Sequence, residues 1–273
     1  MSQVAAESGG INTQPILRWG DGHYRAEQDS LAVEMPVALE FNGVSHAVML
    51  ATPCDLESFA LGFALSEGIV ASRSEFLEAD VDESALGITV HCRITAGAFM
   101  RLKQRRRNLS GRTGCGLCGL ESLAQVMREL PAVPSGQPFA IAALYRALQQ
   151  LADLQPLNRL TGATHAAAWS TPDGLLRQVC EDAGRHNALD KLIGKLAQRR
   201  ADFSSGFLLI TSRASVEMVQ KAATVGIASL VAISAPTALA VTTAQMLNMT
   251  LLGFARGNEF VAYAHGERVG GAS

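Results

Sequence analysis

The chain has 273 residues, of which 48% are hydrophobic, 18% are charged and 5% are aromatic, and its formal net charge is −2. This apolar content excludes a disordered chain, and the length excludes a small domain held together by disulfides. The balance of 23 basic and 25 acidic residues excludes a protein that coats nucleic acid through a general positive charge.

No apolar run reaches the ~20 residues that a membrane-spanning helix needs. The longest run, residues 226–241, is interrupted by Pro236 and by several hydroxyl residues. The N-terminus has Glu7 before any basic residue and lacks the apolar segment of a signal peptide. We therefore predict a cytoplasmic protein that binds neither a membrane nor nucleic acid.

The five cysteines are unevenly spaced. Cys54, Cys92 and Cys180 are isolated, and only Cys115 and Cys118 lie close together in the sequence. An odd count with this spacing does not fit a disulfide framework. In a reducing compartment a close pair indicates a metal half-site, a redox pair or a reactive thiol centre.

The N-terminal half is predicted to be rich in strands. Residues 1–30 show no clear period, which predicts a frayed extension. Strands are expected on both sides of Asn42-Gly43, since this dipeptide favours a type I′ turn, and residues 86–102 alternate again. Asp55 is the expected N-cap of a helix that Gly68 ends. The predicted elements are strands 37–41 and 46–50, helix 56–67, strands within 86–102 and a short helix at 120–130.

Three of the nine prolines fall within residues 131–138, which predicts a linker between two domains. Beyond it, strands and helices alternate, which is typical of an α/β layer with right-handed crossovers. The predicted elements are helix 140–154, strands 164–169 and 175–180, helix 187–199, strand 206–211, helix 215–225, strand 229–233, helix 237–247, and strands 251–255 and 260–264. The predicted domains are a frayed extension (1–30), an N-terminal domain that ends in the Cys-x-x-Cys loop (31–130) and a cofactor-binding domain (139–268).

The Cys115 and Cys118 pair has three interpretations. A zinc half-site would need two further ligands, and the sequence has neither a second Cys-x-x-Cys nor a closely spaced histidine pair, so no metal residues are assigned. A thioredoxin-like redox pair would open a helix directly after a strand, whereas glycines frame both cysteines here. The third interpretation is a mobile nucleophilic thiol that accepts a group and passes it on.

Six basic residues and no acid lie within residues 101–112, directly before this pair. A positive field favours the thiolate over the thiol and would also attract phosphate oxygens. The alternative is an ordinary solvated basic face.

Three turns are expected at one edge of the α/β sheet, where ligands of such sheets bind. They are Ser212-Arg213-Ala-Ser215, Ser234-Ala-Pro-Thr237 and Arg256-Gly257-Asn258. Hydroxyl groups, two arginines and helix N-termini predict a cradle for phosphate or a nucleotide. The alternative is N-capping by Ser212, Ser215 and Ser234. No Walker A or Gly-x-Gly-x-x-Gly motif is present.

Two histidines extend the list of candidates. His186 and Asp190 are four residues apart on a predicted helix, so the acid could orient the imidazole; the alternative is a satisfied surface histidine. His165 follows a strand in the manner of a zinc deaminase, but position 167 is alanine, so the glutamate that deaminase chemistry requires is missing.

Several motifs together resemble the formate dehydrogenase accessory sulfurtransferases, the FdhD family. The resemblance covers residues 31–268 and leaves residues 1–30 outside. The motifs are Arg112-Thr-Gly-Cys-Gly-Leu-Cys-Gly119, Leu160-Thr-Gly-Ala-Thr-His-Ala-Ala167, Glu181-Asp-Ala-Gly-Arg-His-Asn-Ala-Leu-Asp-Lys191, Ser212-Arg-Ala-Ser-Val-Glu-Met-Val-Gln-Lys221 and Ser234-Ala-Pro-Thr237.

The resemblance implies an α/β fold class (α+β overall), with a small strand-rich N-terminal domain and a cytidine-deaminase-like three-layer α/β domain, assembled as a homodimer. It implies a sulfurtransferase that receives sulfur from a cysteine desulfurase as a persulfide. The sulfur then passes to the molybdenum of the bis-molybdopterin guanine dinucleotide cofactor, for formate dehydrogenase. The rival hypothesis is a non-catalytic cofactor chaperone whose Cys-x-x-Cys binds metal or is structural.

The resemblance also implies site residues. Cys115 carries the persulfide and Cys118 is its partner in transfer, whereas Cys54, Cys92 and Cys180 receive no role. A GDP-like ligand can occupy the cofactor site. The cofactor-binding residues are those of the segment Phe254, Ala255, Arg256, Gly257, Asn258 and Glu259, together with Ser212, Arg213, Ser215, Thr237, Arg185 and His186.

Overall fold

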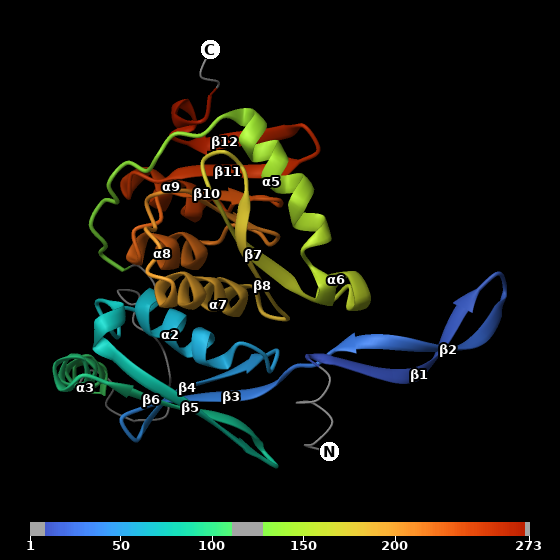
Figure 1. The fold of residues 1–273 in the computed structure, drawn as a ribbon, viewed down its shortest axis with the longest axis horizontal. Helices are drawn as coiled ribbons and strands as arrows, with labels where there is room; N and C mark the ends of the chain where they lie inside the picture. The colour runs from blue at the N-terminus through green and yellow to red at the C-terminus, as the bar shows by residue number, and fades with distance from the viewer. Residues whose placement is uncertain (1–8, 111–127, 271–273) are drawn as a thin grey trace.

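The computed structural model describes residues 9–110 and 128–270. Two sheets lie on opposite sides of a layer of helices (Figure 1). The lower sheet has four strands in the order β4-β3-β6-β5, and the upper has six in the order β12-β11-β10-β9-β7-β8. The predicted mixed α/β architecture is confirmed. The described α-helices are α2 (Leu56–Ser66), α3 (Ala96–Ser110), α5 (Ile141–Asp153), α6 (Pro156–Thr161), α7 (Arg185–Gln198), α8 (Val216–Thr224) and α9 (Ala238–Met246).

The four-stranded sheet follows the predicted alternation. Val37, Leu39 and Phe41 are completely buried and face α2, while the residues between them face outward. The Asn42-Gly43 turn has φ angles of 47° and 78°, as a type I′ turn requires. The strands are β3 (Met35–Phe41), β4 (Val44–Ala51), β5 (Phe76–Ser84) and β6 (Gly87–Ile94).

Two expectations for this half are wrong, and one strand was not predicted. Residues 11–30 are not frayed, because β1 (Ile11–Gly20) and β2 (His23–Ala32) pair along their full length as an antiparallel hairpin. Residues 96–102 begin helix α3 instead of a strand, so the start of the basic segment lies on a helix. Strand β5 was not foreseen, because its exposed side chains carry little apolar alternation. Residues 1–8 and nearly all of the predicted helix 120–130 lie outside the described residues.

The six-stranded sheet matches the predicted order of elements. Strands β9, β10 and β11 are parallel, and β7, β8 and β12 are antiparallel to their neighbours. Alternate residues pack against α5 on one face and against α7 to α9 on the other. The strands are β7 (His165–Ser170), β8 (Leu176–Asp182), β9 (Phe207–Ile210), β10 (Ser229–Ala232), β11 (Thr250–Arg256) and β12 (Glu259–Ala264).

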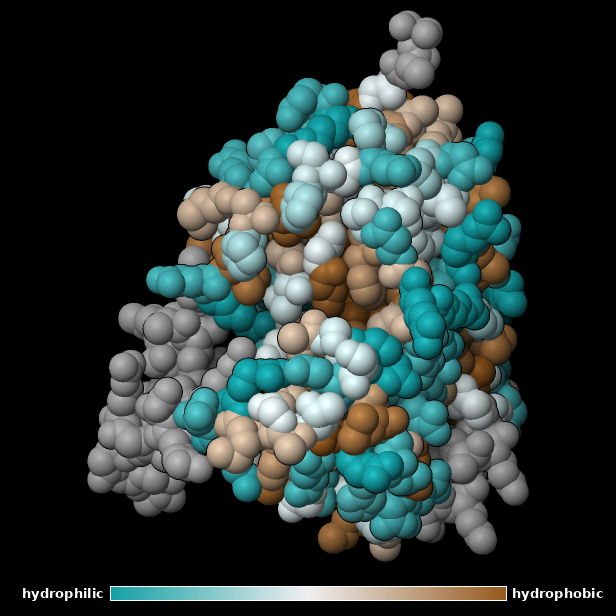
Figure 2. All heavy atoms as spheres, turned by 60° about the vertical axis from the view of Figure 1, so that its left-hand side comes forward, coloured by the Kyte–Doolittle hydropathy of each residue, from teal (hydrophilic) through white to brown (hydrophobic). Residues whose placement is uncertain are grey.

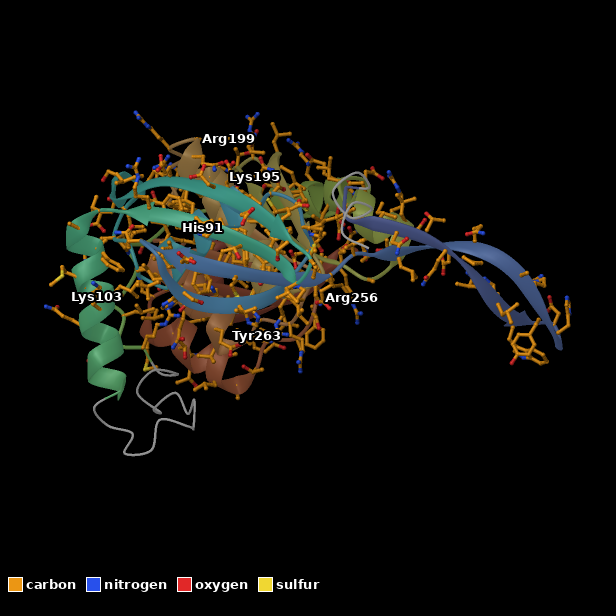
Figure 3. The ribbon with its side chains drawn as sticks, turned by 90° about the horizontal axis from the view of Figure 1, so that it is seen from below. His91, Lys103, Lys195, Arg199, Arg256 and Tyr263 are labelled. Carbon is orange, nitrogen blue, oxygen red and sulfur yellow. The ribbon has the colours of Figure 1, made fainter. Side chains whose placement is uncertain are left out.

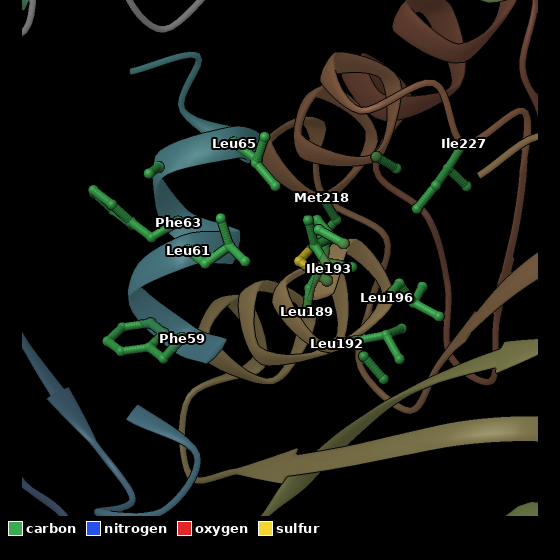
Figure 4. Packing of buried hydrophobic residues seen from close by; sticks show 14 of the residues in the cluster. Phe59, Leu61, Phe63, Leu65, Leu189, Leu192, Ile193, Leu196, Met218 and Ile227 are labelled. Atoms are coloured by element: carbon green, nitrogen blue, oxygen red, sulfur yellow. The ribbon is translucent and has the colours of Figure 1, made fainter. Parts of the chain in front are cut away.

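Helices α2 and α7 join the two sheets at a close crossing. A Cβ atom at Gly62 would lie 1.7 Å from the backbone oxygen of Asp190, and one at Gly194 would lie 1.8 Å from that of Ser58. The two backbones can approach this closely only because both positions are glycine. Figure 4 shows the apolar side chains of both helices meeting around the crossing, and they belong to one cluster shared by both sheets.

Buried ion pairs accompany this apolar contact. The Lys191 Nζ atom lies 2.6 Å from Asp182 Oδ2, and both side chains are completely buried. Lys191 also donates to the Thr52 carbonyl at 2.9 Å, and the Thr52 N–H donates to Asp182 at 3.1 Å. Asp55 was expected to cap α2, but its carboxylate makes no capping bond and pairs with Lys195 Nζ at 2.7 Å. These contacts fix α7 against the loop that precedes α2.

On the face turned forward in Figure 2, apolar side chains reach the surface at mid-height, between the polar side chains of the upper and lower parts. Residues 131–138, the predicted linker, form no helix or strand. None of the described helices is both long enough and apolar enough to cross a membrane.

Candidate functional site

The three turns predicted to form a cradle lie next to one another. Strands β9, β10 and β11 are adjacent and parallel, so their carboxyl ends share one edge of the sheet. The Thr237 N–H donates to the Ala214 carbonyl at 3.0 Å, and the Phe254 N–H donates to the Ser234 carbonyl at 3.2 Å. The predicted convergence of the turns is therefore present in the structure.

The start of α7 reaches the same edge and forms what we call the Glu217 cluster, composed of Arg185, His186, Ser215 and Glu217. Glu217 Oε2 lies 3.1 Å from His186 Nε2 and accepts a hydrogen bond from the Ser215 hydroxyl at 3.2 Å. An Arg185 nitrogen lies 3.9 Å from the same oxygen. One carboxylate thus orients three of the predicted cofactor residues.

The two histidines at this edge favour their neutral forms. Burial, followed by the nearby Arg185 cation, lowers the pKa of His186, and the Glu217 carboxylate opposes this shift. Burial and Arg185 also lower the pKa of His165, which begins β7 at the same edge. An anion bound here would favour the protonated imidazoles, because it would offset the charge of Arg185.

The hydroxyl residues divide between capping and other roles. The Thr237 hydroxyl accepts from the Ala240 N–H at 3.3 Å and caps α9. Ser215 occupies the N-cap position of α8 but bonds Glu217 instead, and the buried Ser212 hydroxyl donates to the Arg213 carbonyl. Capping by Ser212 and Ser215, the alternative interpretation, is therefore wrong. The Arg213 side chain is exposed.

A hollow of about 560 Å³ opens beside the turn between β11 and β12. This volume falls within the usual ~300–1,000 Å³ of ligand pockets. Tyr145 of α5 closes one side and donates its hydroxyl hydrogen to the Asn258 carbonyl at 2.6 Å. Ala255 is completely buried, so it presents no side chain to the hollow. The lining residues are Tyr145, Phe254, Arg256, Asn258, Glu259, Phe260 and Val261.

The backbone at this turn is shaped for close approach. Phe254 and Gly257 have φ angles of 52° and 58°, in the left-handed region. Phe254 is 38% exposed in this conformation, and the Arg256 guanidinium lies on the outer surface (Figure 3). The hollow therefore combines aromatic surface with one cation, Arg256, and one anion, Glu259. The aromatic surface suits a base and the arginine suits a phosphate.

The hollow and the Glu217 cluster are neighbouring parts of one edge and do not form a single pocket. Strand β10 lies between β9, which precedes the cluster, and β11, which precedes the hollow. Two strand spacings of ~4.8 Å set a separation of roughly 10 Å. Sequence reasoning missed Glu217 and Tyr145 as site residues. Glu217 was detectable as an acid in the first turn of a predicted helix, whereas Tyr145 gave no local signal.

The pairing of His186 with Asp190, one of the two interpretations of this histidine, is absent from the structure. Asp190 faces the core, where its carboxylate oxygens lie 2.8 and 2.9 Å from Lys221 Nζ. It also accepts from the Ser66 hydroxyl at 2.6 Å, and its side chain is 1% exposed. Residues four apart are neighbours on a helix surface, but here the first faces the sheet edge and the second faces α2.

The three described cysteines are poor nucleophiles. Burial raises the pKa of Cys92 and Cys180 to about 12. Burial also raises the pKa of Cys54, although Lys191, 3.5 Å from its sulfur, partly opposes the shift. The predicted sulfur-carrying pair, Cys115 and Cys118, lies outside the described residues.

Comparison with known proteins gives consistent results. The model of the FdhD/NarQ family matches residues 32–270. A relative named sulfur carrier protein FdhD from Cupriavidus necator is 54% identical and covers 94% of this chain and 90% of its own length. A relative of the same name from Variovorax paradoxus is 52% identical and covers 89% of this chain and 88% of its own length.

A crystal structure from Desulfotalea psychrophila, assigned as a formate dehydrogenase accessory protein, has the same fold. Its TM-score is 0.74 at 21% identity, and the match covers 95% of this chain and 99% of that chain. A family model spanning most of the chain and relatives at about half identity carry the assignment. The chain therefore belongs to the FdhD/NarQ family.

Proposed function

We propose that this chain is a sulfur carrier that serves formate dehydrogenase maturation. The observation that carries the proposal is that relatives named sulfur carrier protein FdhD are about half identical to it over about nine tenths of its length. In this proposal Cys115 accepts sulfur from a cysteine desulfurase, and the sulfur passes to the molybdenum of the bis-molybdopterin guanine dinucleotide cofactor. The protein acts in the cytoplasm as a homodimer.

The described thiols support the choice of carrier. Thiolate is the nucleophilic form, and a pKa of about 12 leaves about one molecule in 10⁵ ionised at pH 7. Cys92 and Cys180 are thus unsuited to sulfur transfer, and Cys54 has its pKa shifted in the same direction. The candidates are Cys115 and Cys118, which the glycine-framed family motif singles out.

The loading step needs no external oxidant or reductant. The Cys115 thiolate attacks the outer sulfur of a persulfide on the desulfurase, a sulfur–sulfur bond forms on Cys115, and the desulfurase thiolate leaves. The persulfide then carries one sulfur atom to the cofactor, with Cys118 as the partner thiol in transfer. The protein does not retain the transferred sulfur atom, and the cofactor that receives it is the substrate of the second step.

The sheet edge suits the guanine dinucleotide part of this substrate. Its phosphates are anionic, and exposed Arg256, exposed Arg213 and the N-termini of α8 and α9 offer positive potential. Phe254 and Tyr145 offer aromatic surface to a base within the hollow. Arg185, His186, Ser212, Ser215 and Thr237 complete the proposed binding edge.

Mass spectrometry after incubation with a cysteine desulfurase and cysteine tests the carrier. We expect a mass increase of one sulfur atom on wild type and on Cys54→Ser, but none on Cys115→Ala. Cys115→Ala should also fail to activate formate dehydrogenase in a strain that lacks the native protein. Full activation by this variant would refute the proposal. Bound stoichiometric zinc with no sulfur adduct would favour the rival, a non-catalytic cofactor chaperone.

Calorimetry with GDP tests the binding edge separately. Wild type should bind GDP, and Arg256→Ala should weaken binding about tenfold or more, as expected for loss of a charged hydrogen bond to phosphate. Arg93→Ala is the matched control, because this exposed arginine pairs with Glu78 on the distant four-stranded sheet. No measurable GDP affinity in wild type would remove the cradle from the proposal.

A further inference from the structure

The hairpin of β1 and β2, which we call the arm, extends away from the body of the molecule (Figure 1). Each of its strands has ten residues, and the two pair only with each other. Its base is attached to the body, where Gly10 packs against Thr52 and Leu157 and β2 lies beside α6. An isolated two-stranded hairpin is at best marginally stable in water, so an extended arm implies a surface that it covers.

The register of the arm separates two faces. Trp19 pairs with Tyr24 and Leu17 with Ala26, so these four side chains share one face. Trp19 and Tyr24 pack edge to face with centroids 4.9 Å apart. They are nevertheless 61% and 66% exposed, and Leu17 is 69% exposed. This face carries apolar groups and no charge near the tip.

The opposite face of the arm is charged and internally paired. Arg18 pairs with Glu27 at 2.7 Å and lies 3.9 Å from Asp29, and Arg25 lies 3.7 Å from Glu27. A ribbon with one ion-paired face and one exposed aromatic face is built to lie flat on an apolar surface, with the charged face toward water.

The four-stranded sheet offers a matching surface. Its inner face is buried against α2, while no described helix covers its outer face, which is turned to the viewer in Figure 3. On β3 and β4 four outward positions form an apolar patch, in which Val48 pairs with Ala38 and Leu50 with Pro36, and Glu40 lies beyond this patch beside His91 of β6. Val48 and Leu50 are 65% and 55% exposed. The outward charges of this sheet lie mainly on β5 and β6.

We propose that the apolar face of the arm docks on the outer face of β3 and β4 in a second copy of this chain. The arm points away from its own sheet in Figures 1 and 3, so it does not cover that surface in its own chain. Because each copy carries one arm and one open sheet face, a two-fold axis lets both contacts form at once. The docking is independent of sulfur transfer and gives the homodimer a defined interface.

The size of the contact reaches that of a small specific interface. The arm strands have ten residues each, but β3 and β4 have seven and eight, so the docked length is about 25 Å at ~3.3 Å per residue, and two strands about 10 Å wide give each face roughly 250 Å². Two arms and the two surfaces they cover would together remove roughly 1,000 Å² from water, about the least that a specific interface buries. A second copy therefore suffices as the occupant.

Sedimentation equilibrium of the full chain tests the proposal. Wild type should have the mass of two 28.9 kDa chains. Trp19→Glu on the arm and Val48→Glu on the sheet should each weaken association about 30-fold or more, as for a central interface residue. Both positions are exposed in a single copy, so the variants should keep the far-ultraviolet circular dichroism spectrum of the folded chain. Glu27→Gln and Asp82→Asn, on the charged surfaces, are the controls and should change association less than threefold.

A mixture of the two variants distinguishes this arrangement from an arm-to-arm dimer. Each variant alone has no intact contact, whereas a mixed dimer has one, formed by the arm of Val48→Glu and the sheet of Trp19→Glu. The mixture should therefore associate more tightly than either variant alone. A monomeric wild type, or association unchanged by either variant, or a mixture no tighter than its components, would overturn the proposal.

Discussion

The crossing of α2 and α7 allows one quantitative prediction, the effect of Gly194→Ala. The new Cβ atom would lie 1.8 Å from the Ser58 carbonyl oxygen, and Cβ atoms in real proteins essentially never approach another atom within 3.0 Å. The two helices must therefore separate by at least 1.2 Å. Because the obstacle is backbone, no side-chain rotation can relieve the contact.

The magnitude follows from two opposing terms. Forcing a methyl group into a packed interface costs about 1–3 kcal/mol, and a backbone clash lies at the upper end. Alanine regains about 1 kcal/mol over glycine within a helix. Separation would also stretch the buried contact of Lys191 with Asp182. We expect a net loss of about 2 kcal/mol, which for this chain length lowers the thermal midpoint by about 4–8 °C.

Thermal unfolding followed by circular dichroism at 222 nm measures this effect. Gly97→Ala is the matched control, because a Cβ atom there meets only the end of the Arg101 side chain, at 3.7 Å, and the residue also lies in a helix. The control should leave the midpoint unchanged or raise it slightly. A midpoint for Gly194→Ala equal to or above that of wild type would refute the close crossing.

Three further predictions concern buried charge, thiols and pH. Lys191→Met should lower the free energy of unfolding by about 3 kcal/mol or more in urea titrations, because it leaves the buried Asp182 carboxylate without its cation. Arg18→Gln, in an exposed ion pair, is the control and should change the free energy of unfolding by less than about 0.5 kcal/mol. Iodoacetamide at pH 7.5 should leave Cys92 and Cys180 unmodified until urea unfolds the chain; labelling of either in the folded protein would contradict their burial. Folding lowers the pKa of His186, so the unfolded chain binds more protons, and the free energy of unfolding should fall as the pH drops from about 7 through the folded pKa. His186→Gln should reduce that fall. Equal pH slopes of the two proteins in urea titrations would exclude the histidine as its source.

Local patterns predicted most elements of the α/β half because their causes are local. Alternation of buried residues specifies strands such as β9 and β10, and the Asn42-Gly43 dipeptide specifies its turn. Sequence patterns failed to predict the arm, whose strands pair with each other and are not buried in a core. The arm alternates apolar and charged residues across two strands that meet only each other, so it gave no core-facing signal.

The order of turns along the chain was sufficient to predict that Ser215, Thr237 and Arg256 share one sheet edge, because parallel strands place their carboxyl ends together. The glycine-framed cysteines and the family motifs are short local stretches, so the sequence alone was also sufficient to single them out. The partners of the side chains were decided by tertiary structure. His186 bonds Glu217 of another helix, Asp190 turns inward to Lys221, and Tyr145 reaches the β11–β12 turn across more than 100 residues. The physical reason is that each contact depends on how whole helices pack on the sheet, which the residues next to it in the sequence do not determine.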